Sequence, residues 1–119
     1  MNTFIARDLE TGVVIADRVS VADSRITRAV GLLSRNHLNP GEALWIMPCR
    51  GVHTWGMRFT IDIAAMDADG TVVDVVTALR PWRFRLPRRG SLSVLELPEG
   101  TLRACGTSVG HRIALQPSE

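Results

Sequence analysis

The chain of 119 residues contains no lysine, only two cysteines and no long apolar run. Arginine-only usage is the expected result of codon bias in a GC-rich genome, so we attach no function to the missing lysine. Cys49 and Cys105 are too few for a disulfide scaffold, which favours reduced thiols. No stretch approaches the roughly 20 apolar residues that span a bilayer, and residues 1–10 lack the features of a signal peptide. We therefore expect a cytoplasmic protein with no membrane-spanning segment.

Positive charge is concentrated in one short stretch. The sequence has 14 basic and 12 acidic residues, which gives a net charge of +2. Five arginines and no acid lie between positions 80 and 89, which leaves 9 arginines against 12 acids elsewhere, a net charge of −3. These basic surface candidates are Arg80, Arg83, Arg85, Arg88 and Arg89.

Hydrophobic periodicity and turn residues predict a mainly β chain. Alternating or short apolar runs bounded by turn residues indicate strands, and "ADG" at 68–70 is the clearest hairpin signal. Apolar residues spaced by three and four predict a first helix, and a run that ends at Gly106 predicts a second. No repeat or linker divides the chain, so residues 1–119 are expected to form a single α+β domain, compact, barrel-like or two-layered, with six to eight short strands and two short helices. The expected strands are 4–7, 13–16, 43–47, 61–67, 71–78, 81–86, 93–98 and 111–115, and the expected helices are 22–36 and 99–106.

The segment "CRGVHTWGMRF" at 49–59 has the densest chemistry in the chain. Cys49, His53 and Met57 are soft metal ligands spaced by four residues. Gly51, Gly56 and the β-branched residues disfavour the helix that would bring them together. In an extended chain the ligands lie about 13 Å apart at roughly 3.3 Å per residue. We therefore expect no metal and no cofactor.

A nucleophilic site is an alternative interpretation of the same segment. Cys49 with His53 as its base, and Asp62 or Asp67 as the orienting group, would supply the parts of a thiol enzyme. The same distance argument separates Cys49 from His53 in an extended strand. A buried cysteine that packs as a small apolar side chain is the competing interpretation.

A ligand groove is the third interpretation. In an extended "VHTW", His53 and Trp55 face one way, and Arg50 and Arg58 flank the unit beyond the two glycines. Such a site suits a small anion or carboxylate. In the structural alternative, Arg58 pairs with Asp62 and the histidine is hydrogen-bonded in the core. The candidate ligand-binding residues are Cys49, Arg50, His53, Thr54, Trp55, Met57, Arg58 and Asp62.

The basic stretch offers a further ligand class, nucleic acid. A strand over 81–86 would place Trp82, Phe84 and Leu86 on one side and Arg83 and Arg85 on the other. Aromatic residues in such an alternation are expected to be buried rather than available to stack on bases. With a net charge of only +2, we do not expect nucleic-acid binding to be the main role.

Four motifs together resemble a known family. They are "GLLSR", "MPCRGVHTWGMRFTIDIAAMDADGTVVDV", "VLELPEGTL" and "CGTSVG", in that order. The resemblance is to domain-of-unknown-function family 192, small bacterial and archaeal proteins, and it covers about residues 24–115. It implies a compact β-rich α+β domain and no particular reaction, substrate or cofactor. The sequence departs from the family where many relatives have Gly-Asp late in the chain, because Gly110 is followed here by His111.

These observations lead to one main hypothesis and two alternatives. The main one is a bacterial, non-enzymatic binding or accessory module. Its polar groove around "VHTWGMR" would hold a small anionic or polar ligand, or a partner chain. The first alternative is an enzyme that uses Cys49 or His53. The second is nucleic-acid binding through residues 80–89.

Overall fold

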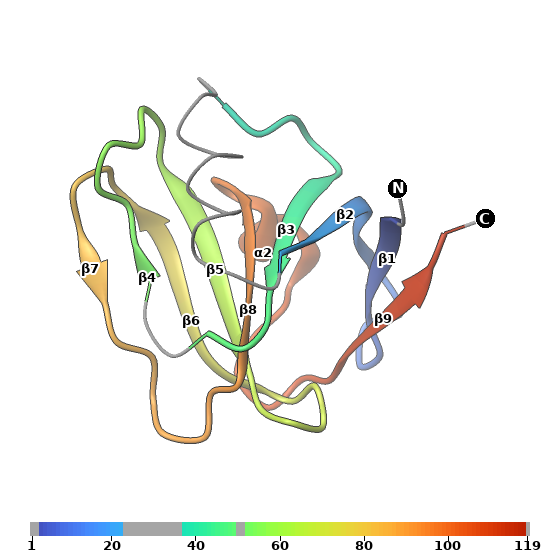
Figure 1. Ribbon diagram of the computed structural model, residues 1–119. Helices are drawn as coiled ribbons and strands as arrows, with labels where there is room; N and C mark the ends of the chain where they lie inside the picture. The colour runs from blue at the N-terminus through green and yellow to red at the C-terminus, as the bar shows by residue number, and fades with distance from the viewer. Residues whose placement is uncertain (1–2, 23–36, 50–51, 119) are drawn as a thin grey trace.

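The computed structural model describes residues 3–22, 37–49 and 52–118. Nine strands and one short helix form within these residues (Figure 1). The helix predicted at 22–36 lies outside the described residues, except for Ala22, which ends a strand. The elements are β1 (Thr3–Asp8), β2 (Val14–Ala22), β3 (Glu42–Ile46), β4 (Val52–His53), β5 (Ile61–Met66), β6 (Val72–Leu79), β7 (Phe84–Arg85), β8 (Ser93–Pro98), α2 (Thr101–Cys105) and β9 (Ile113–Pro117).

Seven of the strands form one curled sheet in the order β6-β5-β8-β3-β2-β1-β9. Among the strands that the structure describes, only β2 and β3 pair in parallel. The two edge strands approach each other at one end, where Thr71 and Arg112 form an isolated bridge. The Val72 amide also donates to the His111 carbonyl oxygen at 2.8 Å. The prediction of a compact, mainly β domain is thus confirmed, with a barrel-like curl in the sheet.

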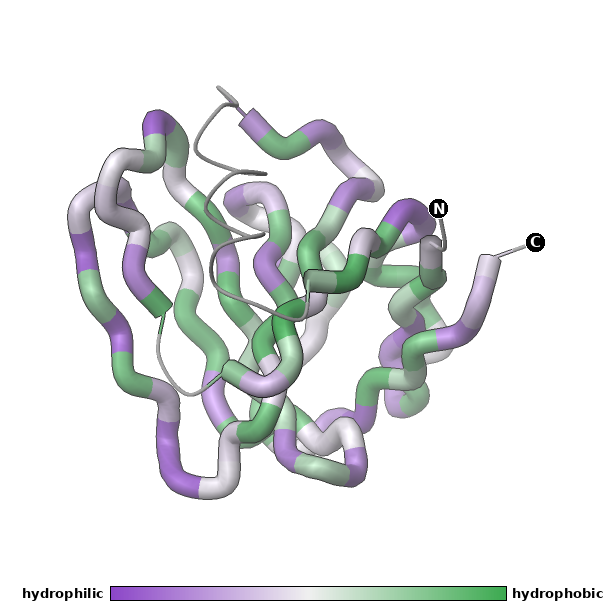
Figure 2. Tube along the Cα trace, viewed as in Figure 1, coloured by the Kyte–Doolittle hydropathy of each residue, from purple (hydrophilic) through white to green (hydrophobic). Residues whose placement is uncertain are grey.

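Strand β5 separates two core clusters, because alternate residues of a strand face opposite ways. Ala64 and Met66 belong to the first core cluster, which also includes Leu102 of α2. Ile61 and Ile63 belong to the second core cluster, on the opposite face. All six residues of β5 are buried. Figure 2 shows the corresponding hydrophobic run along the strands at the centre of the molecule.

The predicted strand at 81–86 is much shorter in the structure. Only Phe84 and Arg85 form a strand, which pairs with β4 in a separate two-stranded sheet. Trp82 has a φ of 64°, in the left-handed region, so the extended conformation begins only after it. The second predicted helix appears as α2 and ends at Gly106, which has a φ of 69°. The "ADG" hairpin is confirmed between β5 and β6.

Candidate functional site

The candidate site is built on the two-stranded sheet of β4 and β7, called the ribbon below. His53 pairs with Phe84, and Val52 pairs with Arg85. Thr54, which is fully buried, holds the chain just beyond the ribbon. Its Oγ1 donates to the Arg80 carbonyl oxygen at 2.6 Å and accepts from the Arg83 amide at 2.9 Å. A single hydroxyl therefore fixes the loop that leads into β7.

The two faces of the ribbon have opposite environments. Residues directly opposite each other in a ladder lie on the same face. Val52 is buried in the second core cluster, and the guanidinium of its partner Arg85 forms an ion pair with the buried Asp74 at 3.1 Å. This pair marks the core side. His53 and Phe84, the other opposite pair, lie on the outer side.

Large apolar side chains gather on and beside this outer side. The ring of Trp55 stacks on His53, with 5.0 Å between centroids and 29° between planes. The Trp82 amide donates to the Thr54 carbonyl oxygen at 2.9 Å, which brings Trp82 next to the end of β4. The exposed face of the ribbon is defined by four side chains that are each more than half exposed, namely Trp55 (54%), Trp82 (66%), Phe84 (59%) and Leu86 (67%).

The expectation that Trp82, Phe84 and Leu86 are buried is wrong. Hydrophobic and hydrophilic residues alternate in sequence through the β7 segment (Figure 2), although the strand itself covers only Phe84 and Arg85. The side that faces the core is the one that carries Arg85, which stays 44% exposed and pairs with the buried Asp74. Alternation in the sequence shows which residues share a face of a strand. Which of the two faces packs against the core depends on where the strand lies in the fold.

Trp82 is held in an unfavourable backbone conformation. A positive φ in a bulky residue other than glycine is uncommon and costs about 1–3 kcal/mol. Here the φ is 64° in a tryptophan that is also two-thirds exposed. Both the positive φ and the exposure of the large apolar ring are unfavourable for stability. We therefore treat Trp82 as a candidate functional residue.

The basic residues of this region differ in their pairing. Arg85 is paired with Asp74, whose Oδ2 also accepts from the Arg88 amide at 3.3 Å. All five arginines in the stretch are exposed, Arg85 included despite its ion pair. Within residues 3–22, 37–49 and 52–118, no carboxylate lies within 4 Å of the guanidinium groups of Arg80, Arg83, Arg88 and Arg89.

The residues predicted from the 49–59 segment divide into buried and accessible ones. Cys49 and Met57 are buried in the second core cluster. Asp62 is fully buried, and its two oxygens accept hydrogen bonds from the amides of Ala78 at 3.0 Å and Leu102 at 3.1 Å. Thr54 is buried, His53 is half-buried, and Trp55 and Arg58 are exposed, while Arg50 lies outside the described residues. The accessible members are thus the histidine, the tryptophan and Arg58.

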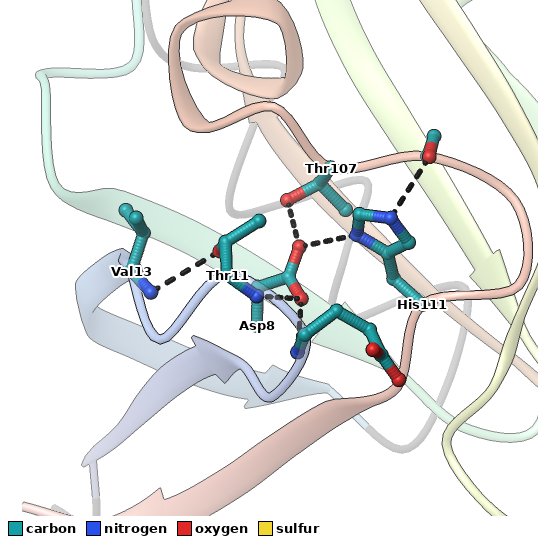
Figure 3. A network of polar contacts seen from close by, with 7 residues as sticks. Asp8, Thr11, Val13, Thr107 and His111 are labelled. Carbon is teal, nitrogen blue, oxygen red and sulfur yellow. Dashed lines mark hydrogen bonds and ion pairs between the residues drawn. The ribbon is translucent and has the colours of Figure 1, made fainter.

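A second polar cluster, absent from the sequence predictions, surrounds Asp8 (Figure 3). Its Oδ2 accepts from Thr107 Oγ1 and from His111 Nδ1, each at 2.8 Å. Its Oδ1 accepts from the amides of Glu10 at 2.9 Å and Thr11 at 3.3 Å. Burial alone would raise the pKa of Asp8, but these hydrogen bonds outweigh it and hold the pKa below its ordinary value. The turn sequence "DLETG" indicates the hydrogen bonds from the nearby amides of Glu10 and Thr11. Nothing in the sequence indicated the distant partners, Thr107 and His111.

In the same cluster, Ser108, His111 and Asp8 contact one another in the order found in the catalytic triad of a serine hydrolase. Ser108 Oγ lies 3.1 Å from His111 Nε2, and the other ring nitrogen contacts Asp8. However, the His111 amide donates to the Ser108 carbonyl oxygen at 3.1 Å, so both side chains belong to one tight turn. Their contact follows from the turn itself. We therefore assign the cluster a structural role, joining the β1–β2 turn to the segment that precedes β9.

Comparison with known proteins gives a consistent family relationship. The model of the family DUF192, described as "Uncharacterized ACR", matches residues 7–115. A UPF0127 protein from Pyrococcus abyssi is 37% identical over 81% of this chain and 84% of its own length. One from Pyrococcus furiosus is 34% identical over 86% of this chain and 90% of its own length. The predicted bacterial source stays a prediction, since these relatives are archaeal.

Two solved structures have the same fold. A protein from Sinorhizobium meliloti, proposed to be a transcription regulator, has a TM-score of 0.79 at 21% identity, covering 96% of this chain and 92% of that one. A protein of unknown function from Novosphingobium aromaticivorans has a TM-score of 0.80 at 22% identity, covering 95% of this chain and 84% of that one. At these identities the likeness shows the fold alone. Among the described residues, no helix is long and apolar enough to cross a membrane.

Proposed function

This chain belongs to the uncharacterised family DUF192, and we propose that it is a non-enzymatic binding module. Its ligand would lie against the exposed face of the ribbon. The observation that carries this proposal is the exposure of Trp55, Trp82, Phe84 and Leu86 on one short structure. Scattered apolar residues on a surface are ordinary, but a contiguous group of them marks an interaction site.

An anionic ligand with flat groups suits this surface best, and a single nucleic-acid strand is the ligand class we favour. Exposed rings can stack on bases, while the neighbouring arginines can contact phosphates. Four exposed arginines without a carboxylate partner among the described residues supply that charge. The predicted burial of the aromatic residues was the main argument against nucleic acid, and that argument no longer applies. The small net charge remains and leads us to expect weak, salt-sensitive binding.

The residues predicted from the sequence to line a small-anion groove divide into accessible residues and buried ones. His53, Trp55 and Arg58 can contact a ligand. Thr54 and Met57 are buried beneath the ribbon, and Asp62 joins β6 to α2 through the amides of Ala78 and Leu102. The alternative of a thiol enzyme has less support, because a catalytic thiolate needs access and Cys49 is only 5% exposed. We therefore propose that the contact surface is the outer side of the ribbon, which includes His53 and Trp55 of the 49–59 segment.

Fluorescence anisotropy with a labelled oligothymidine of about 12 nucleotides tests the proposal, since such strands match known single-strand site sizes. We expect a Kd of about 1–100 µM at low salt that weakens steeply as NaCl is added. Trp82→Ala and Phe84→Ala should each weaken binding about tenfold through lost stacking. Arg83→Gln should reduce the salt dependence by about one phosphate contact.

Matched controls come from the opposite part of the fold. Leu9→Ala removes a similarly exposed apolar side chain at the β1–β2 turn, and Arg7→Gln removes a charge from β1. Both controls should bind the oligonucleotide like the unchanged protein. Absence of binding at low salt, or equal weakening by Leu9→Ala and Trp82→Ala, contradicts the nucleic-acid proposal.

An acidic polypeptide segment is the second candidate ligand. Tryptophan, phenylalanine and arginine are the residues enriched in protein interfaces, and they are the residues exposed on the ribbon. A labelled peptide of alternating glutamate and leucine should then bind, lose affinity in Trp82→Ala, and fail to be displaced by oligothymidine. Direct binding of oligothymidine with no direct binding of the peptide would favour the nucleic-acid ligand.

A further inference from the structure

We infer that the loop joining β7 to β8 forms a binding site for a phosphate monoester. The site is lined by Leu86, Pro87, Arg88, Arg89, Gly90, Ser91 and Leu92, together with Ala68 of the β5–β6 turn. This inference deepens the proposed function by naming the anionic group that is recognised. It uses residues other than the aromatic ones, so the two ideas can fail separately.

The pocket has the size of a small-ligand site. Its volume is about 510 Å³, and sites for small organic ligands span roughly 300–1,000 Å³. A bare phosphate ion would leave much of that volume unfilled. The apolar lining from Leu86, Pro87 and Leu92 can cover an organic group attached to the phosphate. A phosphate monoester of modest size, or the terminal phosphate of a nucleic-acid strand, matches both features.

The charge around the pocket favours an anion. Arg88 and Arg89 are exposed, and none of the described carboxylates lies within 4 Å of either guanidinium. The nearby Asp74 is already paired with Arg85. Asp67 and Asp69 flank Ala68 and oppose an anion, and the Oδ1 of Asp67 already accepts hydrogen bonds from the amides of Asp69 at 2.9 Å and Thr71 at 3.0 Å. Arg88 and Arg89 line the pocket itself, whereas neither aspartate does, and arginine binds phosphate oxygens in a bidentate manner.

Ser91 brings an unsatisfied hydroxyl close to the pocket, although the oxygen does not face the open volume in this structure. Its Oγ is buried and has no hydrogen-bond partner among the described residues. Buried hydroxyls are normally satisfied, because leaving one without a partner costs free energy. Ser91 lines the pocket, so a change of its side-chain rotamer would direct the hydroxyl at a bound phosphate. The Ser91 amide donates to the Arg88 carbonyl oxygen at 3.3 Å, which keeps the serine and the arginine in one turn.

Titration of the full chain with inorganic phosphate, phenyl phosphate and a 5′-phosphorylated oligothymidine tests the inference and separates the sources of phosphate. The readout is the ¹H–¹⁵N NMR shift of the Gly90 and Ser91 amides, with NaCl at equal ionic strength as the control. Phenyl phosphate should bind more tightly than inorganic phosphate because the ring fills the apolar part of the pocket. A 5′-hydroxyl oligothymidine should give smaller shifts at these two amides than the phosphorylated strand.

Three variants locate the site. Arg88→Gln and Arg89→Gln should each weaken phenyl phosphate binding about tenfold, as expected for loss of one charge-assisted hydrogen bond. Ser91→Ala should weaken it about threefold to tenfold while leaving the melting temperature of the free protein unchanged or raised. Arg103→Gln, on α2, is the charge-matched control and should have no effect.

Two results would overturn the inference. One is an equal response of the loop amides to phosphate and to NaCl. The other is equal weakening by Arg89→Gln and Arg103→Gln, which would mean that only the overall charge matters. The proposed function has its own test, because Trp82→Ala should leave phenyl phosphate binding unchanged while it weakens the oligonucleotide.

Discussion

Replacing Asp8 with alanine should cause a large loss of stability that depends on pH. The side chain is fully buried and accepts four hydrogen bonds, from Thr107, His111 and two backbone amides. The two amides lie in an exposed turn and can bond to water instead, whereas Thr107 is buried. Removing one partner of a buried charged network costs about 3–5 kcal/mol. For a chain of this size that corresponds to a fall in Tm of roughly 10–20 °C.

The pH dependence follows from the lowered pKa of Asp8. A carboxyl with a lower pKa in the folded state than in the unfolded state stabilises the fold when it is ionised. This stabilisation is complete above the unfolded pKa of about 3.9 and is lost as pH falls through the lower folded pKa. The difference in unfolding free energy between the unchanged protein and Asp8→Ala should therefore be constant from neutral pH to about pH 5 and shrink below pH 4.

Urea denaturation at closely spaced pH values measures this difference. Asp8→Asn serves as a shape-matched control, since its amide retains some hydrogen bonds without the charge. It should lose less stability than Asp8→Ala, about 1–3 kcal/mol. A loss below about 1 kcal/mol for Asp8→Ala, the level of an exposed interaction, would refute the reasoning. So would a difference that stays constant down to pH 2.5.

Further predictions concern the ribbon and the two cysteines. Thr54→Val keeps the shape of the side chain but removes the hydrogen bonds to the Arg80 carbonyl oxygen and the Arg83 amide, so the free energy of unfolding should fall by about 2–3 kcal/mol. Urea denaturation measures this loss, and Thr54→Ser should lose much less. Cys49, buried in the core, should react with iodoacetamide only on unfolding, as mass spectrometry of timed samples can show. The half-buried Cys105 should react slowly at neutral pH, because burial and the negative charge of a neighbouring carboxylate raise the pKa of its thiol; rapid labelling of either cysteine in the folded protein contradicts the burial argument.

The exposed face of the ribbon shows how the site depends on tertiary placement. Thr54 forms four hydrogen bonds with the loop before β7 through its hydroxyl and amide, and this loop carries Trp82 with its positive φ. The exposed rings are therefore held by a buried residue from a different segment. The resemblance to an uncharacterised family pointed to the 49–59 region as special, but it did not divide that region into supporting and contacting residues.

Local patterns in the sequence were sufficient for several of the strands and turns. The hairpin around "ADG", the buried run of β5 and the end of α2 at Gly106 all depend on residues within a few positions of one another. Alternation and turn propensity act over that range, so they are readable without the fold. The sequence likewise determined that Trp82, Phe84 and Leu86 alternate with arginines.

Tertiary structure alone decided which side of that alternation is covered and which distant groups meet. Asp74 lies on β6 and pairs with Arg85 of β7, which places Arg85 on the core side of the ribbon and leaves Phe84 on the outer side. Asp8 and His111 are 103 positions apart and come together only because β1 pairs with β9. The physical reason is that burial and charge pairing depend on the position of a residue relative to the whole core, whereas periodicity reports only the relation of a residue to its neighbours in the chain.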